Sequence, residues 1–453
     1  MGTTRRQFLR RSALAAGSAL AMPYILPSGR AFAKTGHRSA EHVVVVLFAG
    51  GVRQQEAVLQ RYLADSQGLN IEGNVMSNLL SGDLPDDKVV FGTTAAGSVP
   101  IPKILDRPLD AQGLLLPEVR FSGAATGHYV GLSAALSGHY GTTQGLRQRP
   151  LHPTMFEYLR RHGGASATEA WFVGNGLTGS VPLLNHSEHP DYGAAYGANM
   201  IIPSVTFGAQ GEAHAKDARV FHPDEELPAI EQMRAFLNQR FSAPDGDGGD
   251  APLAALGNTP EERRRIKAFI QETFERLDAG LVPLPPVADN GDLITVAFAL
   301  EVMRYFKPRL TVVNMSSVDT CHNNFTNYLQ NLHRCDHGVG FLWEYLQTQI
   351  PEMADNTALV VVPEHGRNLE SNNILDVNDW AAFDHDSDAN ARRIFGMLAG
   401  PGIDAGLRLG SEDAPVGDSA DVVLTVAELL GIKPEVEGAG LVDRAGRSWF
   451  DRM

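Results

Sequence analysis

The chain has 453 residues, of which 43% are hydrophobic and 20% are charged, which is the composition of a folded globular protein. This length is enough for one large domain or two ordinary ones with a sizeable core. The formal net charge of −15 argues against non-specific binding to nucleic acid, because an acidic surface does not neutralise phosphates.

Residues 1–33 are expected to be an export signal rather than part of the fold. A pair of arginines, Arg5 and Arg6, precedes a moderately apolar stretch, and Ala31-Phe32-Ala33 offers a small-x-small cleavage site. This pattern resembles a twin-arginine signal, which predicts passage through the twin-arginine export machinery to a periplasmic or secreted location. An uncleaved amphipathic N-terminus is the alternative. No later run approaches ~18–20 apolar residues, so we expect no stable membrane span after cleavage.

The first half of the chain predicts strands that alternate with helices. The run HVVVVLF at 42–48 is typical of a parallel strand buried on both faces, and Gly50-Gly51 predicts a sharp turn after it. Further strands are predicted at 118–122, 170–173 and 199–205, and helices at 54–63, 129–136 and 154–161. Irregular, Gly- and Pro-rich sequence predicts insertions near 66–117 and 180–260.

The same alternation continues to the C-terminal end. Helices are predicted at 228–241, from 260 onward, at 293–306, after 326 and at 420–430, and strands at 310–315, 358–362 and 393–399. The sequence Thr259-Pro260-Glu261-Glu262 is a helix start, with a cap residue, a proline and early acids. Together these elements predict an α/β fold with a mainly parallel central sheet, in one domain over residues 34–453.

Carboxylates and imidazoles recur just past two of the predicted strands, at the sheet edge where an α/β fold binds its ligands. Three pairs follow one another: Asp319 and His322, Glu364 and His365, Asp384 and His385. Each pair alone is explained by a helix cap and a surface histidine. Three pairs in order favour a metal site, and carboxylates with neutral imidazoles suit Zn, Mn or Fe.

Other residues offer less specific signals. Thr126 is the candidate nucleophile, since small residues and a following helix would aim its hydroxyl at an anion; Ser122, His128 and Ser133 compete with it, and a plain Thr cap is the alternative. His186 and His189 are further candidate ligands, although their loop also reads as ordinary polar surface. Cys321 and Cys335 either form one disulfide or remain free thiols.

Several motifs resemble the alkaline phosphatase superfamily, which includes sulfatases and nucleotide phosphodiesterases. TALVVVPEHGRN is similar to its TLVVFTSDHG-type segment, ADVVLTVAELLGI to the DIxPTxxxLLGI segment of sulfatases, and GLSAALSGHYGT to the helix end after the sulfatase nucleophile. The order FAGGVR, VDTCHNN, PEHGRN, FDH resembles the DUF1501 group of exported proteins. The resemblance implies a three-layer αβα sandwich.

The resemblance also implies a function and roles for residues. It implies an exported metal-dependent hydrolase of phosphate or sulfate esters, acting on an anionic ester, with one or two divalent ions. The implied ligands are Asp319, His322, Glu364, His365 and His385. Thr126 or His128 would face the substrate, and Arg53 would supply charge where the superfamily places an Asp after the first strand. Because that Asp and a clear nucleophile are missing, the alternative is a non-catalytic binding or assembly protein on the same scaffold.

Overall fold

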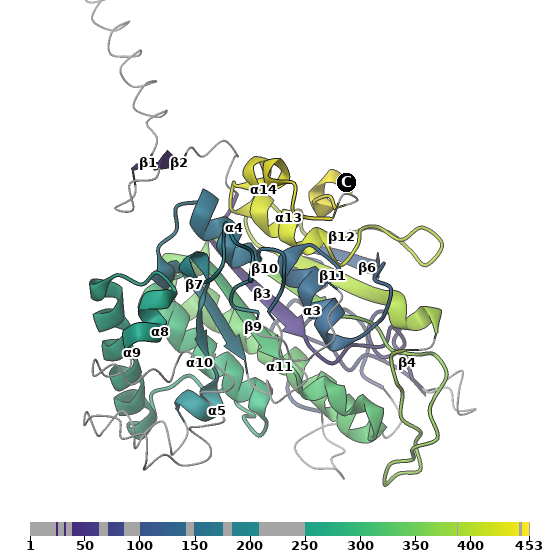
Figure 1. The fold of residues 1–453 in the computed structure, drawn as a ribbon. Coiled ribbons are helices and arrows are strands. Elements are labelled where there is room, and N and C mark those ends of the chain that lie inside the picture. The colour runs from purple at the N-terminus through teal and green to yellow at the C-terminus, as the bar shows by residue number, and fades with distance from the viewer. Residues whose placement is uncertain are drawn as a thin grey trace, which may run out of the picture.

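A mixed eight-stranded sheet forms the centre of the protein (Figure 1). The computed structural model describes residues 24–25, 31–32, 39–62, 71–85, 100–141, 149–174, 184–207, 250–386, 388–443 and 446–452. The sheet has the order β12-β6-β11-β10-β3-β9-β7-β8. Its strands are β3 (His42–Phe48), β6 (Leu114–Arg120), β7 (Ala170–Gly174), β8 (Asn199–Ile201), β9 (Leu310–Met315), β10 (Thr357–Pro363), β11 (Arg393–Ala399) and β12 (Leu407–Arg408).

All neighbouring strands of this sheet are parallel except where β11 takes part. β11 pairs antiparallel with both β10 and β6. The central strand β3 pairs parallel with β10 on one side and β9 on the other, and all seven of its residues are buried. The predicted α/β class with a mainly parallel sheet is therefore confirmed.

Helices cover both faces of the sheet and give three layers (Figure 1). Alternate residues of β3 enter two separate apolar cores, one on each face. One core contains residues of α2 (Leu109–Gln112), α9 (Pro260–Asp278), α10 (Gly291–Phe306), α11 (Phe325–Gln349) and α12 (Pro351–Ala354). The other contains residues of α3 (His128–Ser137), α4 (Met155–His162), α13 (Asp421–Leu429) and α14 (Lys433–Ala439). The predicted three-layer αβα sandwich is confirmed.

Shorter elements complete the description. The helices α5 (Pro203–Thr206) and α8 (Asp250–Ala255) contact α10 and α9 respectively. Two small antiparallel pairs are β1 (Tyr24–Ile25) with β2 (Ala31–Phe32), and β4 (Arg61–Tyr62) with β5 (Ile71–Glu72). The 3₁₀ turns are η1 (Ala167–Glu169), η2 (Ala194–Tyr196), η4 (Ser317–His322), η5 (Ala389–Arg392) and η6 (Trp449–Arg452).

Several predicted elements are confirmed with their local causes. Helix α9 begins at a complete capping box, in which Glu262 N–H donates to Thr259 Oγ1 and Thr259 N–H donates to the Glu262 carboxylate. Residues Gly50 and Gly51 turn the chain after β3 with φ values of +115° and +78°. No helix within the described ranges is long and apolar enough to cross a membrane.

Two predictions about local structure are wrong. The helix expected at 54–63 is a series of turns followed by β4. Its first polar residues are buried and bond inward, with Gln54 donating to Pro117 O and Gln55 to Asn390 Oδ1, and these contacts hold the segment in turns. The strand expected at 199–205 stops at Ile201 because Pro203 begins helix α5.

Parts of the predicted insertions belong to the sheet. Strand β6 begins at Leu114, within the stretch 66–117, and β8 lies within 180–260. The helix predicted at 228–241 lies outside the described residues, as does most of the predicted signal at 1–33.

Candidate metal centre

The strands β3, β9 and β10 end side by side, and the turns that follow them touch. A Cβ atom added at Gly50 would lie 2.5 Å from Asp319 N, and one at Gly51 would lie 2.3 Å from Nδ1 of His365. Both glycines also have positive φ values. Only glycine therefore lets the turn after β3 approach the loops after β9 and β10 this closely.

Two further segments complete the edge. Helix α3 begins with His128, so this imidazole lies at the helix N-terminus. Gly131, one turn later, packs against the chain after β10, because an added Cβ would lie 2.6 Å from Glu364 O. The segment before β11 supplies His385. Five separate stretches of chain thus meet at one place.

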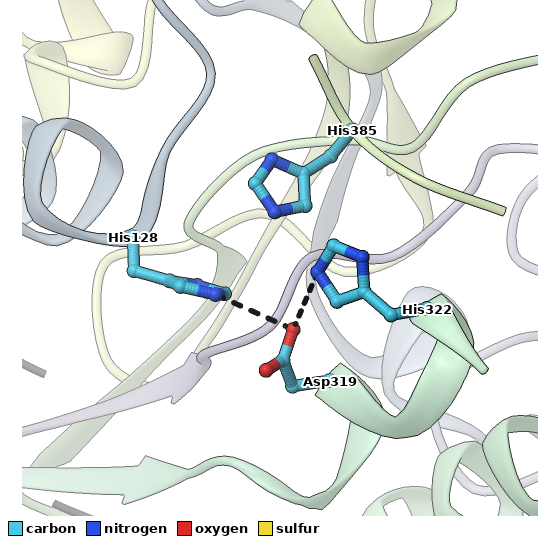
Figure 2. Close-up of side chains that lie close together, drawn as sticks. All are labelled: His128, Asp319, His322 and His385. Atoms are coloured by element: carbon cyan, nitrogen blue, oxygen red, sulfur yellow. Dashed lines mark ion pairs between the residues drawn. The ribbon is translucent and has the colours of Figure 1, made fainter. Parts of the chain in front are cut away.

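Four of these side chains can reach a single ion (Figure 2). They are His128, Asp319, His322 and His385, with one donor atom each within 4.8 Å of the others. The Nε2 atoms of His128 and His322 lie 3.4 Å and 3.3 Å from Asp319 Oδ1. A tetrahedral ion with bonds of about 2.0–2.1 Å separates its ligand atoms by about 3.4 Å. The two contacts of Asp319 therefore have the spacing of ligands on one tetrahedral ion, and the donor atom of His385 lies within 4.8 Å of the other three.

A second group, formed by His128, Glu364 and His365, shares His128 with the first. Glu364 is fully buried and receives hydrogen bonds on Oε1 from Gly50 N–H and from His128 Nδ1, the latter at 2.7 Å. Its other oxygen, Oε2, is buried without a hydrogen-bond partner. A buried carboxylate oxygen without a partner is rare, and a cation would satisfy it.

Outer partners hold the histidines so that Nε2 faces the centre. The Nδ1 atom of His322 lies 2.7 Å from Asp384 Oδ1, and that of His365 lies 2.7 Å from Gly366 O. The Nδ1 atom of His385 is hydrogen-bonded to Thr126 O. Asp384 is itself fixed by a hydrogen bond from Asn372 at 3.1 Å. Metal-binding histidines are typically held in this way by a carboxylate or carbonyl. The arrangement fits a metal centre built from these residues.

The charges of the centre favour a cation as well. Burial lowers the pKa of His385 to about 2, with His365 and Arg367 adding to the effect, so His385 is a neutral imidazole. Burial acts to raise the pKa of Asp319, but His322, His128 and Arg367 outweigh it and lower the pKa to about 2. Burial likewise opposes the low pKa of Glu364, which His128 and His365 hold well below its ordinary value. Both carboxylates are ionised.

His128 has the opposite shift. Burial lowers its pKa, but the neighbouring Glu364 and Asp319 carboxylates overcome this and raise the pKa to about 9. In the absence of an ion, a protonated His128 therefore provides positive charge between the two carboxylates. An ion bound at Nε2 would replace that proton.

The predicted nucleophile does not present a free hydroxyl. Thr126 is 5% exposed, and its Oγ1 donates to His385 O while its carbonyl accepts from His385 Nδ1. Ser122 Oγ donates to Asp418, and Ser133 Oγ is buried. Among these candidates, His128 lies in both metal-capable groups, where it is a candidate ligand.

Arg53 does not join the centre. Its guanidinium is buried, forms an ion pair with Glu56 and lies 3.7 Å from the ring centroid of Phe383. Arg367, in the PEHGRN segment, instead donates to Asp319 Oδ1 at 2.9 Å. Arg367 has no role in the prediction from the sequence, although a charged residue two positions after the Glu364–His365 pair was a usable signal.

The remaining candidates lie apart from the centre. His186 and His189 belong to neither of the two metal-capable groups found among the described residues. Cys321 and Cys335 are buried free thiols, which settles the alternatives left open by the sequence. Burial raises the pKa of Cys321 to about 12, so this thiol is protonated.

Comparison with known sequences gives one family match. The model of the family described as type I phosphodiesterase / nucleotide pyrophosphatase matches residues 233–438. This range contains every member of the two metal-capable groups except His128, together with Arg367. No curated protein sequence matches the chain.

Several solved structures are similar to the chain in fold. A protein of the alkaline phosphatase superfamily from Vibrio parahaemolyticus is 11% identical, with 93% of this chain and 75% of that chain covered and a TM-score of 0.38. A lipoteichoic acid synthase from Listeria monocytogenes is 12% identical, with 96% and 81% covered and a TM-score of 0.40. A phosphonate monoester hydrolase from Silicibacter pomeroyi is 13% identical, with 87% and 73% covered and a TM-score of 0.36. Over the segment that carries most of the ligands, the chain is thus similar to the type I phosphodiesterase family.

Proposed function

We propose that the protein is an exported, metal-dependent hydrolase of phosphate or sulfate esters. The observation that carries this proposal is the set of His128, Asp319, His322 and His385, whose donor atoms lie within 4.8 Å of one another, with the outer nitrogens of His322 and His385 already engaged. The family match over residues 233–438 supports ester hydrolysis. The motif order shared with the DUF1501 group and the twin-arginine pattern at 1–33 support export to the periplasm or beyond.

The donor set suits a particular metal. Three imidazole nitrogens and one carboxylate favour Zn, with Mn or Fe as alternatives. Such an ion would supply Lewis acidity toward an ester oxygen, and it would activate a water by taking it as a fifth ligand, because four protein ligands fill a tetrahedral site. Because the hydroxyls of Thr126 and Ser122 are engaged in hydrogen bonds and that of Ser133 is buried, we propose direct attack by water rather than a covalent intermediate.

The chain's own residues favour an anionic substrate. Helix α3 begins at His128, so the positive end of its dipole lies at the centre. The Arg367 guanidinium adds a buried positive charge beside Asp319. Both features stabilise negative charge next to the ligands, which is what a phosphate or sulfate ester brings.

Metal analysis combined with a substrate screen tests this function. The purified chain is expected to contain Zn, Mn or Fe by mass spectrometry, and to hydrolyse an aryl phosphate, phosphodiester or sulfate in a reaction that a chelator stops. His322→Ala with His385→Ala should abolish both metal binding and turnover. His189→Ala, a histidine outside the centre, is the matched control and should change neither.

A second function stays open because one observation favours it. The Thr126 hydroxyl donates to a backbone carbonyl and is not free to attack a substrate. A binding or assembly protein on this scaffold, which needs no nucleophile, would have the same feature. Bound metal without turnover on any of the three ester classes would support that function. A chain that binds no metal would contradict the proposed centre itself.

A further inference from the structure

Arg367 joins the loops of the centre through a single buried side chain. It lies on the loop after β10 and is fully buried. Its guanidinium donates to Gly50 O and to Gly51 O, the latter at 3.3 Å, to Phe383 O at 2.9 Å, and to Asp319 Oδ1 at 2.9 Å. These acceptors belong to three other segments: the turn after β3, the chain before His385 and the η4 turn after β9.

Each of these segments positions a ligand. The η4 turn carries Asp319 itself, and His385 follows two residues after Phe383. Gly51 lies against the ring of His365. A shift of the Arg367 side chain would therefore displace candidate ligands on all three segments, although its guanidinium donates to none of the histidine nitrogens.

Burying this charge is costly unless its hydrogen bonds are made. The contacts made by Arg367 are one carboxylate and four carbonyls, the fourth being Asp319 O at 3.4 Å. Only a guanidinium has donors fixed in a planar fork that can serve five acceptors in different directions, whereas an ammonium group has three donors on one atom. The geometry thus specifies arginine at this position.

The same charge bears on how many ions the centre holds. Asp319 Oδ1 is shared between Arg367 and the four-ligand group. The two candidate groups also share His128, so both could be filled only if one imidazole bridged two ions. With the Arg367 guanidinium fixed beside Asp319 and one ion already bound, a second ion would be repelled by both charges, and this repulsion is stronger in a partly buried site than in water.

We propose that Arg367 positions the ligands of the metal centre. We also propose that its fixed positive charge takes the place of a second ion, so that the centre holds one ion. This inference rests on the proposed metal-dependent function and adds to it the number of ions and the residue that orders the ligands. Arg367 acts through Asp319 and the three backbone segments rather than by touching the substrate.

Metal stoichiometry and the spectrum of a substituted ion test the proposal. The wild-type chain should retain one equivalent of Zn after dialysis, and its Co²⁺ form should show the intense visible bands of a tetrahedral site. In Arg367→Gln, which keeps much of the side-chain length without the charge, Zn affinity should fall about 10–100-fold and the Co²⁺ bands should weaken. Circular dichroism would establish that the variant is folded.

Arg160→Gln is the matched control. Arg160 is also a buried arginine that joins segments of chain, donating to Gly197 O and to Leu256 O at 2.7 Å, but it contacts no candidate ligand. This variant should lose thermal stability while its Zn affinity and Co²⁺ spectrum stay as in the wild type. If Arg367→Gln does not fold, Arg367→Lys is measured in its place, and it should also weaken binding because the fork is lost.

The outcomes separate this inference from the function beneath it. A folded Arg367 variant with wild-type Zn affinity and Co²⁺ spectrum would overturn the positioning role. Two tightly held ions in the wild type would overturn the single-ion centre while leaving the metal-dependent function intact. A wild-type chain that retains no ion would overturn both.

Discussion

Thr126 and His385 hold each other through two reciprocal hydrogen bonds. The Thr126 hydroxyl donates to His385 O, and His385 Nδ1 donates to Thr126 O. The hydroxyl predicted to attack the substrate is instead used to fix the backbone of a histidine in the metal group. This pair joins the loop before α3 to the segment before β11.

Thr126→Val removes the hydroxyl but keeps the shape of the side chain. Because His385 loses one of its two anchors, we expect Zn affinity to fall about 10-fold, measured by competition with a chromophoric chelator. Thr126→Ser keeps the donor and should behave as the wild type. A Val variant with normal Zn affinity and no turnover would instead identify Thr126 as a nucleophile.

Asp384→Ala tests the outer partner of His322. The Asp384 carboxylate accepts from His322 Nδ1 and fixes the ring, so its loss should lower Zn affinity by about 10–100-fold without unfolding the protein. Asp386→Ala, an exposed acid two residues further on, is the control and should leave the affinity unchanged. Equal effects of the two variants would point to general surface charge rather than to the ring contact.

The metal-free protein should lose stability as the pH rises from about 6.5 to about 9. The pKa of His128 is raised from 6.5 to about 9 in the folded state by Glu364 and Asp319, against the effect of burial. A raised pKa contributes stability that is fully present below 6.5 and is lost as the pH passes the folded value. Thermal melts with chelator should show this decline in the wild type but not in His128→Gln.

Zn affinity should change in the opposite direction over the same pH range. An ion at His128 Nε2 competes with the proton, so binding should strengthen up to about pH 9 and then level off. A pH-independent affinity between 6.5 and 9 would mean that His128 is not a ligand.

The Arg53–Glu56 pair is expected to support the fold rather than bind substrate. Both side chains are buried, so Arg53→Met leaves the Glu56 carboxylate without its partner and should cost about 3–5 kcal/mol of unfolding free energy. The double variant Arg53→Met with Glu56→Leu should recover most of this loss in denaturant titrations. Its KM for an ester substrate should match the wild type, and a large rise in KM would restore the predicted substrate role of Arg53.

Gly131→Ala should disturb the centre through a contact rather than through a charge. The new Cβ would lie 2.6 Å from Glu364 O and 3.1 Å from Glu364 Cβ, so helix α3 or the chain after β10 must move. Both thermal stability and Zn affinity should fall. Gly438→Ala, at an open position in helix α14, should instead stabilise the protein by about 0.4–1 kcal/mol.

The fold could be predicted because its strands carry a local signal. The runs in β3 and β10 are continuous and apolar, as strands covered on both faces must be, and the cap at Thr259 fixes the start of α9. The turns at 54–59 could not be predicted, since the sequence there has helical composition. Contacts with Pro117 and Asn390, far along the chain, decide its conformation.

The candidate site could be predicted only in part, because contacts between distant segments also decide which side chains reach it. Asp319, His322, Glu364 and His365 follow strands directly, so the parallel sheet brings them to one edge. The ligand role of His128 and the engagement of Thr126 depend on where α3 packs, which no local pattern encodes. The position of the buried Arg367 guanidinium likewise depends on acceptors from three segments that are distant in the sequence.

The antiparallel direction of β11 leaves one part of the molecule open to redesign. A parallel connection has to travel back along the whole sheet, but the chain from β10 to β11 leaves and rejoins the sheet at the same edge. The beginning of this connection carries His365 and its end carries His385. Its middle forms a hairpin closed by the β-bridge between Leu375 and Ala381. Loops grafted between these last two residues would vary this connection while the strand register remains as it is, provided that Asp376, which accepts from Thr326 N–H at the start of α11, is kept.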